Sequence, residues 1–207
     1  MKTLDTTPII GIIRGIPEEH LLPTLEAAIS GGLSTIEITM NTANAEKLIQ
    51  LAATHFSKEC AIGAGTVTTI RECTEALSAG ARYIVAPHFE SNIASLCKDK
   101  EIPYFPGALT PTEIFNAWSN GAEMVKVFPV SALGGIDYIK NLRGPYHNIA
   151  LLACGGVTLN NMESYFEAGV NAIAIGTQIF KPDWIKSKDY KSIETAARNF
   201  VSKAIQN

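Results

Sequence analysis

The chain has 207 residues, of which 46% are hydrophobic and 18% charged, and its formal net charge is −3. This length and composition predict one packed domain spanning residues 1–207, and the charge provides no general field for nucleic acid or an anionic membrane surface. No apolar run approaches the roughly 18 residues of a membrane span. The N-terminal residues lack the apolar core of a secretory signal, and the four cysteines form no CxxC pair, which predicts reduced thiols in a cytoplasmic protein.

Short runs rich in β-branched residues alternate with longer amphipathic stretches along the whole chain. Such alternation predicts βα units and a parallel sheet. The expected strands are 9–13, 35–39, 61–64, 83–86, 103–105, the short run around Lys126, 149–153 and 172–175. The expected helices are 18–30, 43–55, 70–78, 92–98, 111–118, 136–142, 159–166 and 193–204.

Eight βα units without an internal linker predict an α/β fold, namely a compact (β/α)8 TIM barrel in a single domain. The alternative is an open, doubly wound sheet. It is less favoured because no GxGxxG follows the first strand and the glycine pairs suited to phosphate binding come late in the chain. In a barrel, the functional residues are expected at the carboxyl ends of the strands.

Lys126 is the most informative residue, because it lies near the end of an apolar strand that Phe128-Pro129 terminates. An unperturbed lysine has a pKa of about 10.4, and burial lowers the pKa of such an amine. A neutral amine attacks carbonyl carbon and forms a Schiff base. The ordinary alternative is an ion-paired or snorkelling lysine at a strand end.

Glu37 shares one face of its strand with Thr35 and Thr39, while isoleucines occupy the other face. Period-two alternation therefore directs Glu37 into the barrel. A carboxylate in such an interior has a raised pKa, which suits a proton shuttle near neutral pH. A structural carboxylate paired with Arg14 or Lys126 remains an alternative.

The other strand ends carry small and polar residues. The glycine pair Gly155-Gly156 and the following unit's Gly176-Thr177 are typical of a barrel phosphate site, where backbone N–H groups approach the anion. Gly63, Ala64 and Gly65 leave room for a small ligand, with the Thr66 hydroxyl placed for its carboxylate, although close packing would explain these glycines equally well. His88 has no partner at metal-ligand spacing, so no metal is expected. Schiff-base chemistry at Lys126 would need no cofactor.

The order and spacing of several motifs make the chain resemble the 2-keto-3-deoxy-6-phosphogluconate (KDPG) / 4-hydroxy-2-oxoglutarate (KHG) aldolase family, including its phosphogalactonate branch. The motifs are Glu37-Ile38-Thr39, Gly63-Ala64-Gly65-Thr66-Val67, Pro106-Gly107 with Thr110-Pro111-Thr112-Glu113, Lys126-Val127-Phe128-Pro129, Gly144-Pro145 and Gly155-Gly156-Val157. The resemblance extends from Ile9 to about Lys203.

The resemblance implies a class I aldolase, a homotrimer acting on a phosphorylated keto acid, with Lys126 as the Schiff-base lysine and Glu37 as the acid/base. The expected product pair is pyruvate with glyceraldehyde 3-phosphate, or with glyoxylate from 4-hydroxy-2-oxoglutarate. The implied substrate-binding residues are Arg14, Asn41, Thr66, Pro87, Phe128, Cys154, Gly155, Gly156, Gly176 and Thr177.

Two departures from the phosphogluconate pattern leave the C4 epimer open. Asn41 stands where that pattern often has arginine, and Cys154 stands where it commonly has threonine, near the substrate's C4 hydroxyl. Asn41 with Arg14-Gly15 is closer to the phosphogalactonate branch. Rival hypotheses are a phosphate-binding barrel isomerase, a metal-dependent aldolase and a non-catalytic sugar-phosphate binder.

Overall fold

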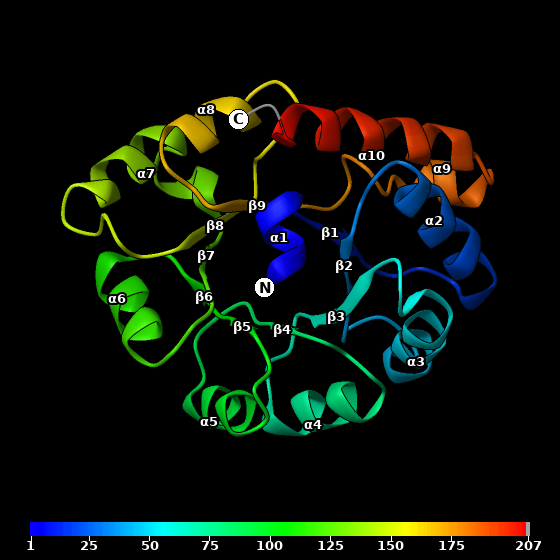
Figure 1. Ribbon diagram of the computed structural model, residues 1–207, viewed down its shortest axis with the longest axis horizontal. Coiled ribbons are helices and arrows are strands. Elements are labelled where there is room, and N and C mark those ends of the chain that lie inside the picture. Colours follow the sequence, from blue (N-terminus) through cyan, green and yellow to red (C-terminus); the bar gives the residue numbers. More distant parts are fainter. Residues whose placement is uncertain (206–207) are drawn as a thin grey trace.

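The computed structural model describes residues 1–205, which form a single barrel of parallel strands surrounded by helices (Figure 1). Every strand pair is parallel, and the order around the sheet is β5-β4-β3-β2-β1-β9-β8-β7-β6. The strands are β1 (Ile9–Ile13), β2 (Thr35–Thr39), β3 (Ala61–Gly65), β4 (Ile84–Val85), β5 (Tyr104–Phe105), β6 (Gly107–Ala108), β7 (Val125–Val127), β8 (Leu151–Cys154) and β9 (Ala172–Ile175).

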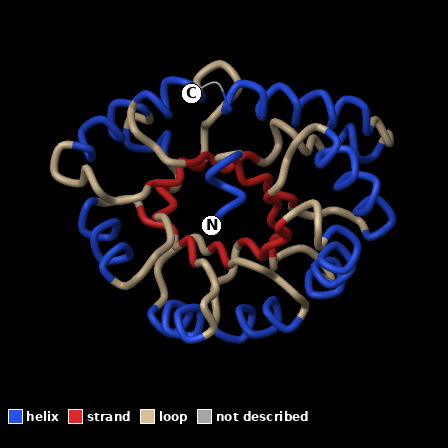
Figure 2. The backbone as a smooth tube through the Cα atoms, in the orientation of Figure 1, coloured by secondary structure: helices blue, strands red, loops and turns tan. Residues whose placement is uncertain are grey.

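The two ends of this strand order are consecutive in the sequence, so the sheet closes on itself. β5 pairs with β4 and β6 pairs with β7, and only Pro106 separates β5 from β6. The chain trace therefore forms a ring of strands within a ring of helices (Figure 2). This confirms the (β/α)8 barrel and excludes the doubly wound alternative. The expected strand 103–105 is present as β5, but β6 was not predicted. Pro106, which has no N–H to continue the ladder, separates these two strands.

The predicted helices are all present, with small shifts at their ends. The helices are α1 (Lys2–Thr6), α2 (Glu18–Ser30), α3 (Ala45–Phe56), α4 (Ile70–Ser78), α5 (Ser91–Asp99), α6 (Pro111–Ser119), η1 (Val130–Leu133), α7 (Ile136–Arg143), α8 (Met162–Glu167), α9 (Pro182–Lys186) and α10 (Tyr190–Ile205). Three short elements, α1, η1 and α9, were not predicted, since a single turn carries too few residues to show helical periodicity.

Helix α1 crosses the barrel axis in the view of Figure 1. Its Leu4 is 3% exposed and packs with the interior side chains of the strands. The Thr35 hydroxyl at the start of β2 donates to the Thr3 hydroxyl at 3.0 Å. The terminal ammonium of Met1 pairs with Glu123, which precedes β7. These contacts hold α1 across the amino-terminal end of the barrel, so the carboxyl ends of the strands form the other mouth.

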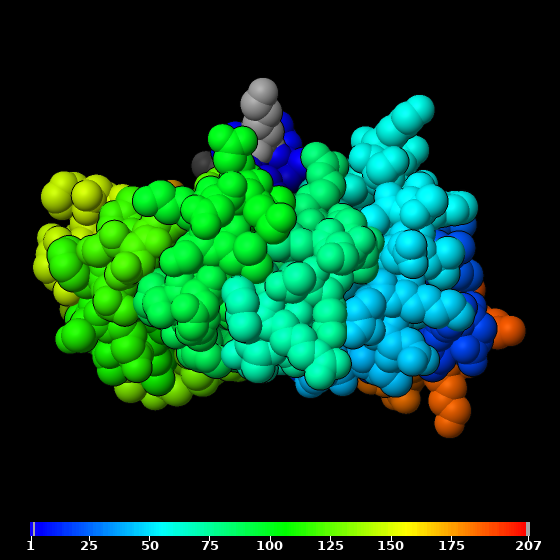
Figure 3. Space-filling view, turned by 90° about the horizontal axis from the view of Figure 1, so that it is seen from below, coloured from blue at the N-terminus to red at the C-terminus, as the bar shows by residue number. Residues whose placement is uncertain are grey.

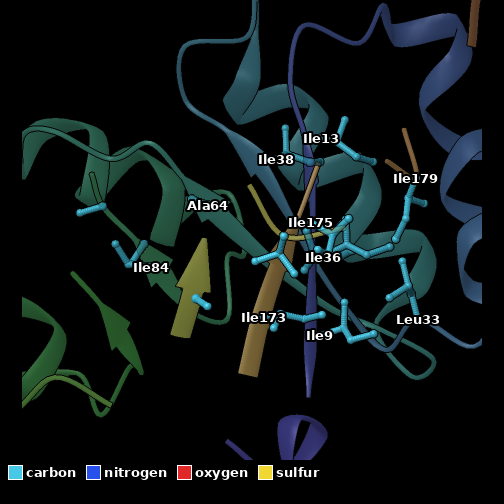
Figure 4. Packing of buried hydrophobic residues seen from close by; sticks show 14 of the residues in the cluster. Ile9, Ile13, Leu33, Ile36, Ile38, Ala64, Ile84, Ile173, Ile175 and Ile179 are labelled. Carbon is cyan, nitrogen blue, oxygen red and sulfur yellow. The ribbon is translucent and has the colours of Figure 1, made fainter. Parts of the chain in front are cut away.

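The core consists of two layers separated by the sheet. The outer layer fills the space between strands and helices, with isoleucines from β1, β2 and β9 packed together (Figure 4). The inner layer lies inside the barrel and includes Ile10, Val85, Phe105 and Leu152. Alternate residues of each strand enter alternate layers, as the pleat requires. A side-on view shows the outer helices forming a continuous surface (Figure 3).

Among residues 1–205, none of the helices combines the length and the apolar character needed to cross a membrane. The four cysteines are buried free thiols.

Candidate active site

Lys126 is the central residue of β7 and is 6% exposed. Its neighbours Val125 and Val127 pack outward with the helices, so the Lys126 side chain enters the barrel. Met124 also packs with the interior layer. Ala122 belongs to the outer layer, because β7 begins only at Val125.

The Lys126 ammonium lies 5.2 Å from the centroid of the Phe128 ring, within the range of a cation–π contact. In the part of the chain that the structure describes, no carboxylate forms an ion pair with this amine. Lys126 is aligned with Gly107 on one side and Leu152 on the other. The amine therefore lies between a residue without a side chain and an aliphatic one.

Glu37 is the central residue of β2 and is 1% exposed. Its carboxyl group occupies the space over β3, where a Cβ on Gly65 would collide with it. Burial raises the pKa of Glu37, and the charges of Lys126 and Arg14 act in the opposite direction. Lys126 and Glu37 therefore interact electrostatically inside one barrel, with the glycines of β3 providing the room for the carboxylate.

Arg14, Asn41 and Thr66 come together at the carboxyl ends of β1, β2 and β3. The Arg14 guanidinium donates from Nη1 to Asn41 Oδ1 at 2.7 Å and from Nη2 to Thr66 Oγ1 at 3.1 Å. Thr66 has a φ of 54°, a left-handed conformation rare for a β-branched residue. Strain of this kind persists where the surrounding contacts impose it, and it is common at ligand sites.

Gly155 and Gly156 follow β8 and pack against the loop after β7. Their φ angles are 86° and 94°, in the region that favours glycine. A Cβ on Gly156 would lie 2.7 Å from the Cβ of Ser131. The backbone amide of Ser131 donates to Gly155 at 3.2 Å. The loops after β7 and β8 are thus a backbone-rich part of the rim.

Gly176 begins a helical turn directly after β9. Its carbonyl accepts hydrogen bonds from the amides of Ile179 and Phe180, both at 3.0 Å. Thr177 lies in this turn and is exposed. The first amides of such a turn have no partner within the turn, which is the arrangement that favours an anion.

Pro87 and Phe128 line one cavity of about 300 Å³ at the barrel mouth. Gly107 also lines it, and a Cβ there would collide with the Pro87 carbonyl. Phe128 is thus shared between this cavity and the surroundings of the Lys126 ammonium. His88 lies on its exposed rim.

Cys154 ends β8 and is buried with the interior layer. Burial raises the pKa of its thiol, while the charge of Lys126 acts to lower it. The charge of Glu37 also acts on this thiol, which places Cys154 within the electrostatic reach of both groups. Among residues 1–205, there is no cluster of three or more His, Cys, Asp or Glu side chains arranged to hold a metal.

The predicted residues therefore occupy four parts of one barrel mouth: the interior with Lys126, Glu37 and Cys154, the Arg14 cluster, Pro87 after β4, and the loops after β7, β8 and β9. Tyr83, whose ring lies inside the barrel beside Glu37, was not predicted as a site residue. Gly63 has the same inward phase as Gly65, so a side chain from a neighbouring strand must cover it, but the sequence does not indicate which one.

Comparisons with known proteins agree with this geometry. The family model "KDPG and KHG aldolase" matches residues 1–196. The 2-dehydro-3-deoxy-phosphogluconate aldolase of Haemophilus influenzae is 32% identical over 97% of this chain and 93% of its own length. The 2-dehydro-3-deoxy-6-phosphogalactonate aldolase of Escherichia coli K12 is 32% identical over 87% of this chain and 88% of its own.

Among solved structures, KDPG aldolase from Legionella pneumophila, with pyruvate captured as a covalent carbinolamine intermediate, superposes with a TM-score of 0.90. It is 28% identical and covers 96% of each chain. The chain belongs to the KDPG and KHG aldolase family. It is an aldolase of the Schiff-base class, a carbon–carbon lyase.

Proposed function

We propose that this enzyme cleaves 2-dehydro-3-deoxy-6-phosphogluconate to pyruvate and glyceraldehyde 3-phosphate, with Lys126 as the nucleophile and Glu37 as the acid/base. The observation that carries this proposal is the burial of the Lys126 amine in the same interior as the buried Glu37 carboxylate, whose pKa the charge of Lys126 acts to lower. The covalent pyruvate adduct of the Legionella relative supports it.

In the proposed reaction, the Lys126 amine attacks the C2 ketone and water leaves, which produces an iminium ion. The iminium accepts the electron pair of the C3–C4 bond as that bond breaks. Glu37, directly or through water, takes the proton of the C4 hydroxyl, and the aldehyde leaves. The remaining enamine is protonated at C3, and water releases pyruvate and restores the amine. No cofactor enters any of these steps.

We assign the substrate carboxylate to the cluster of Arg14, Asn41 and Thr66. A guanidinium presents donors in the planar geometry that a carboxylate matches, and the Thr66 hydroxyl adds another. We assign the substrate phosphate to Gly155, Gly156, Gly176 and Thr177, where backbone amides and positive φ angles suit an anion. Pro87 and Phe128 border the reacting end.

A second candidate substrate is the C4 epimer, 2-dehydro-3-deoxy-6-phosphogalactonate. The Arg14–Asn41 hydrogen bond favours it, because this pair departs from the phosphogluconate pattern and resembles the phosphogalactonate branch. Cys154 also favours this epimer, since it lacks the hydroxyl group with which a threonine would hydrogen-bond to the C4 hydroxyl of the substrate. The similarity to the phosphogalactonate enzyme of Escherichia coli supports the same possibility.

The test is pyruvate release coupled to lactate dehydrogenase, measured with both six-carbon phosphates and with 4-hydroxy-2-oxoglutarate. The proposal predicts turnover of at least one phosphorylated epimer that persists in the presence of a chelator. Binding of both compounds without pyruvate release would favour a sugar-phosphate binder. Interconversion without cleavage would favour an isomerase.

We also propose that the enzyme is a homotrimer, as the family resemblance implies, and that it is located in the cytoplasm, as its free cysteines suggest. Light scattering during size-exclusion chromatography would test the assembly, with three times the 22.2 kDa chain mass expected. A monomeric mass at working concentration would contradict it. Fractionation of the source cells would test the location.

A further inference from the structure

Tyr83 precedes β4 and is fully buried inside the barrel. Its ring packs edge-on against Phe105, with centroids 5.8 Å apart and an interplanar angle of 83°. The three atoms nearest to a Cβ on Gly63 would be Tyr83 Cζ, Cε1 and Cε2. These atoms form the end of the ring that carries the hydroxyl, so the phenol crosses β3 with its polar end directed toward β2.

Glu37 lies on β2, directly across from Gly63 in the strand register. Its carboxyl group extends over Gly65, two residues farther along β3. The two inward-facing glycines of β3 therefore leave two adjacent spaces. A phenol from the β4 side occupies one, and a carboxylate from the β2 side occupies the other.

Both groups carry a buried oxygen that lacks a partner. Among the described residues, Glu37 Oε2 and Tyr83 Oη are inaccessible and make no hydrogen bond. A buried polar atom without a partner destabilises the fold, so such atoms in native structures call for an explanation. Burial, followed by the negative charge of Glu37, raises the pKa of Tyr83 well above its usual value. The phenol therefore stays protonated and can donate, and the neighbouring carboxylate accepts when it is ionised.

We propose that Tyr83 is a positioning residue for the acid/base of this aldolase: its hydroxyl donates a hydrogen bond to one water molecule that in turn donates to Glu37, and thereby sets the orientation and proton affinity of the carboxylate. This inference rests on the acid/base role proposed for Glu37. The hydrogen bond favours the ionised carboxylate and opposes the effect of burial.

The other charged and titratable groups that face this pair come from several elements. Lys126 on β7 and Arg14 after β1 act on Glu37, and Cys154 on β8 is affected by it. Cys60 acts on Tyr83. All four groups are retained when Tyr83 is replaced by phenylalanine. A change in the titration of Glu37 in that variant therefore reports on the hydroxyl.

The test is the rate at which the methyl protons of saturating pyruvate exchange with deuterium, followed by NMR between pH 4.5 and 9. Under these conditions the Schiff base is already formed, and Glu37 must be ionised to remove a proton. We expect Tyr83→Phe to move the ascending limb of the profile up by about 0.5–1 pH unit, a change of roughly three- to tenfold in proton affinity. The exchange rate on the plateau at high pH should fall by a much smaller factor than the rate on the ascending limb.

Tyr104→Phe is the matched control. It also removes a phenolic hydroxyl from a buried ring, but Tyr104 packs in the outer layer and its hydroxyl bonds with the backbone of His88 and Glu90. Its pH profile should match that of the wild type. Melting temperatures of both variants show whether each one folds. Tyr83→Phe should keep the packing of the wild type, because the phenylalanine ring fills the same space above Gly63.

The outcomes separate this inference from the function on which it rests. A Tyr83→Phe profile that superposes on the wild type, while Glu37→Gln strongly lowers the exchange rate, would overturn the role of Tyr83 alone. Near-normal exchange in Glu37→Gln would overturn the acid/base assignment and the role of Tyr83 with it. In the residual exchange of Glu37→Gln, adding Tyr83→Phe should have no further effect on pH dependence.

Discussion

Arg14 and Thr66 follow strands that are not adjacent in the barrel, yet the guanidinium of Arg14 donates to the Thr66 hydroxyl at 3.1 Å. The intervening strand β2 contributes Asn41, which accepts a second hydrogen bond from the same guanidinium. Gly15 is also held in place, because its amide donates to the Thr42 hydroxyl at 3.0 Å. Three loops are thus fixed around a cation that faces the barrel mouth.

This cluster predicts that Arg14→Met weakens keto-acid binding more than it slows chemistry. Loss of charge-assisted hydrogen bonds to a carboxylate should raise KM by about 10- to 100-fold, with a smaller effect on kcat. The measurement is steady-state pyruvate release. Arg82→Met is the control, since Arg82 lies on the β3–β4 connection, away from this mouth, and donates to the Ser57 carbonyl. An unchanged KM in Arg14→Met would contradict the assignment of the substrate carboxylate to this cluster.

The buried carboxylate of Glu37 predicts a pH-dependent gain in stability when it is removed. Because its pKa is raised in the fold, the native state binds this proton more strongly than the unfolded state, and the contribution of Glu37 to stability falls as pH rises. Glu37→Gln should therefore raise Tm by about 2–5 °C at pH 8. The gain should shrink toward pH 4. Calorimetry at both pH values checks this, and a gain that grows on acidification would contradict it.

Gly156→Ala should selectively weaken the binding of phosphorylated substrates. The substitution imposes strain at a φ of 94° and crowds Ser131 in the adjoining loop. KM for the six-carbon phosphate should rise by at least about tenfold, whereas turnover of 4-hydroxy-2-oxoglutarate should change by less than about threefold. Gly121→Ala is the matched control, with a similar φ of 88° and open space around it. Equal losses with both substrates would argue against a phosphate site here.

Cys154→Thr should change the preference between the two C4 epimers. A threonine hydroxyl at this buried position can hydrogen-bond with the C4 hydroxyl of one epimer only. We expect the ratio of kcat/KM to move toward the phosphogluconate by roughly tenfold. Parallel assays with both epimers check this, with Cys97→Ser as a control on a thiol buried between helices. An unaltered ratio of kcat/KM for the two epimers would show that Cys154 does not contribute to recognition of the C4 hydroxyl.

The barrel and much of the mouth could be predicted from the sequence because period-two alternation and strand endings are local signals. Glu37 between Thr35 and Thr39 indicated an inward carboxylate, and β2 confirms that orientation. Carboxyl ends of parallel strands meet at one rim, so Arg14 and Thr66 could be expected to lie close together. Their hydrogen bond, however, depends on loop conformations such as the positive φ of Thr66.

Other features had no local signal. Tyr83 reads as an ordinary core aromatic, since only the pairing of three strands places its ring over Gly63 and beside Glu37. The division of one strand into β5 and β6 also required the pairing of both halves with different partners. The position of α1 under the barrel depends on long-range contacts of Leu4.

The most direct measurement is mass spectrometry of the enzyme after borohydride reduction in the presence of pyruvate. Schiff-base formation at Lys126 predicts one reduced pyruvate adduct per chain, located in the peptide that contains Lys126, and no adduct in Lys126→Met. The buried position of this amine beside Phe128 makes it the expected site. An adduct that forms in Lys126→Met to the same extent, on any other lysine, would contradict the assignment of the nucleophile.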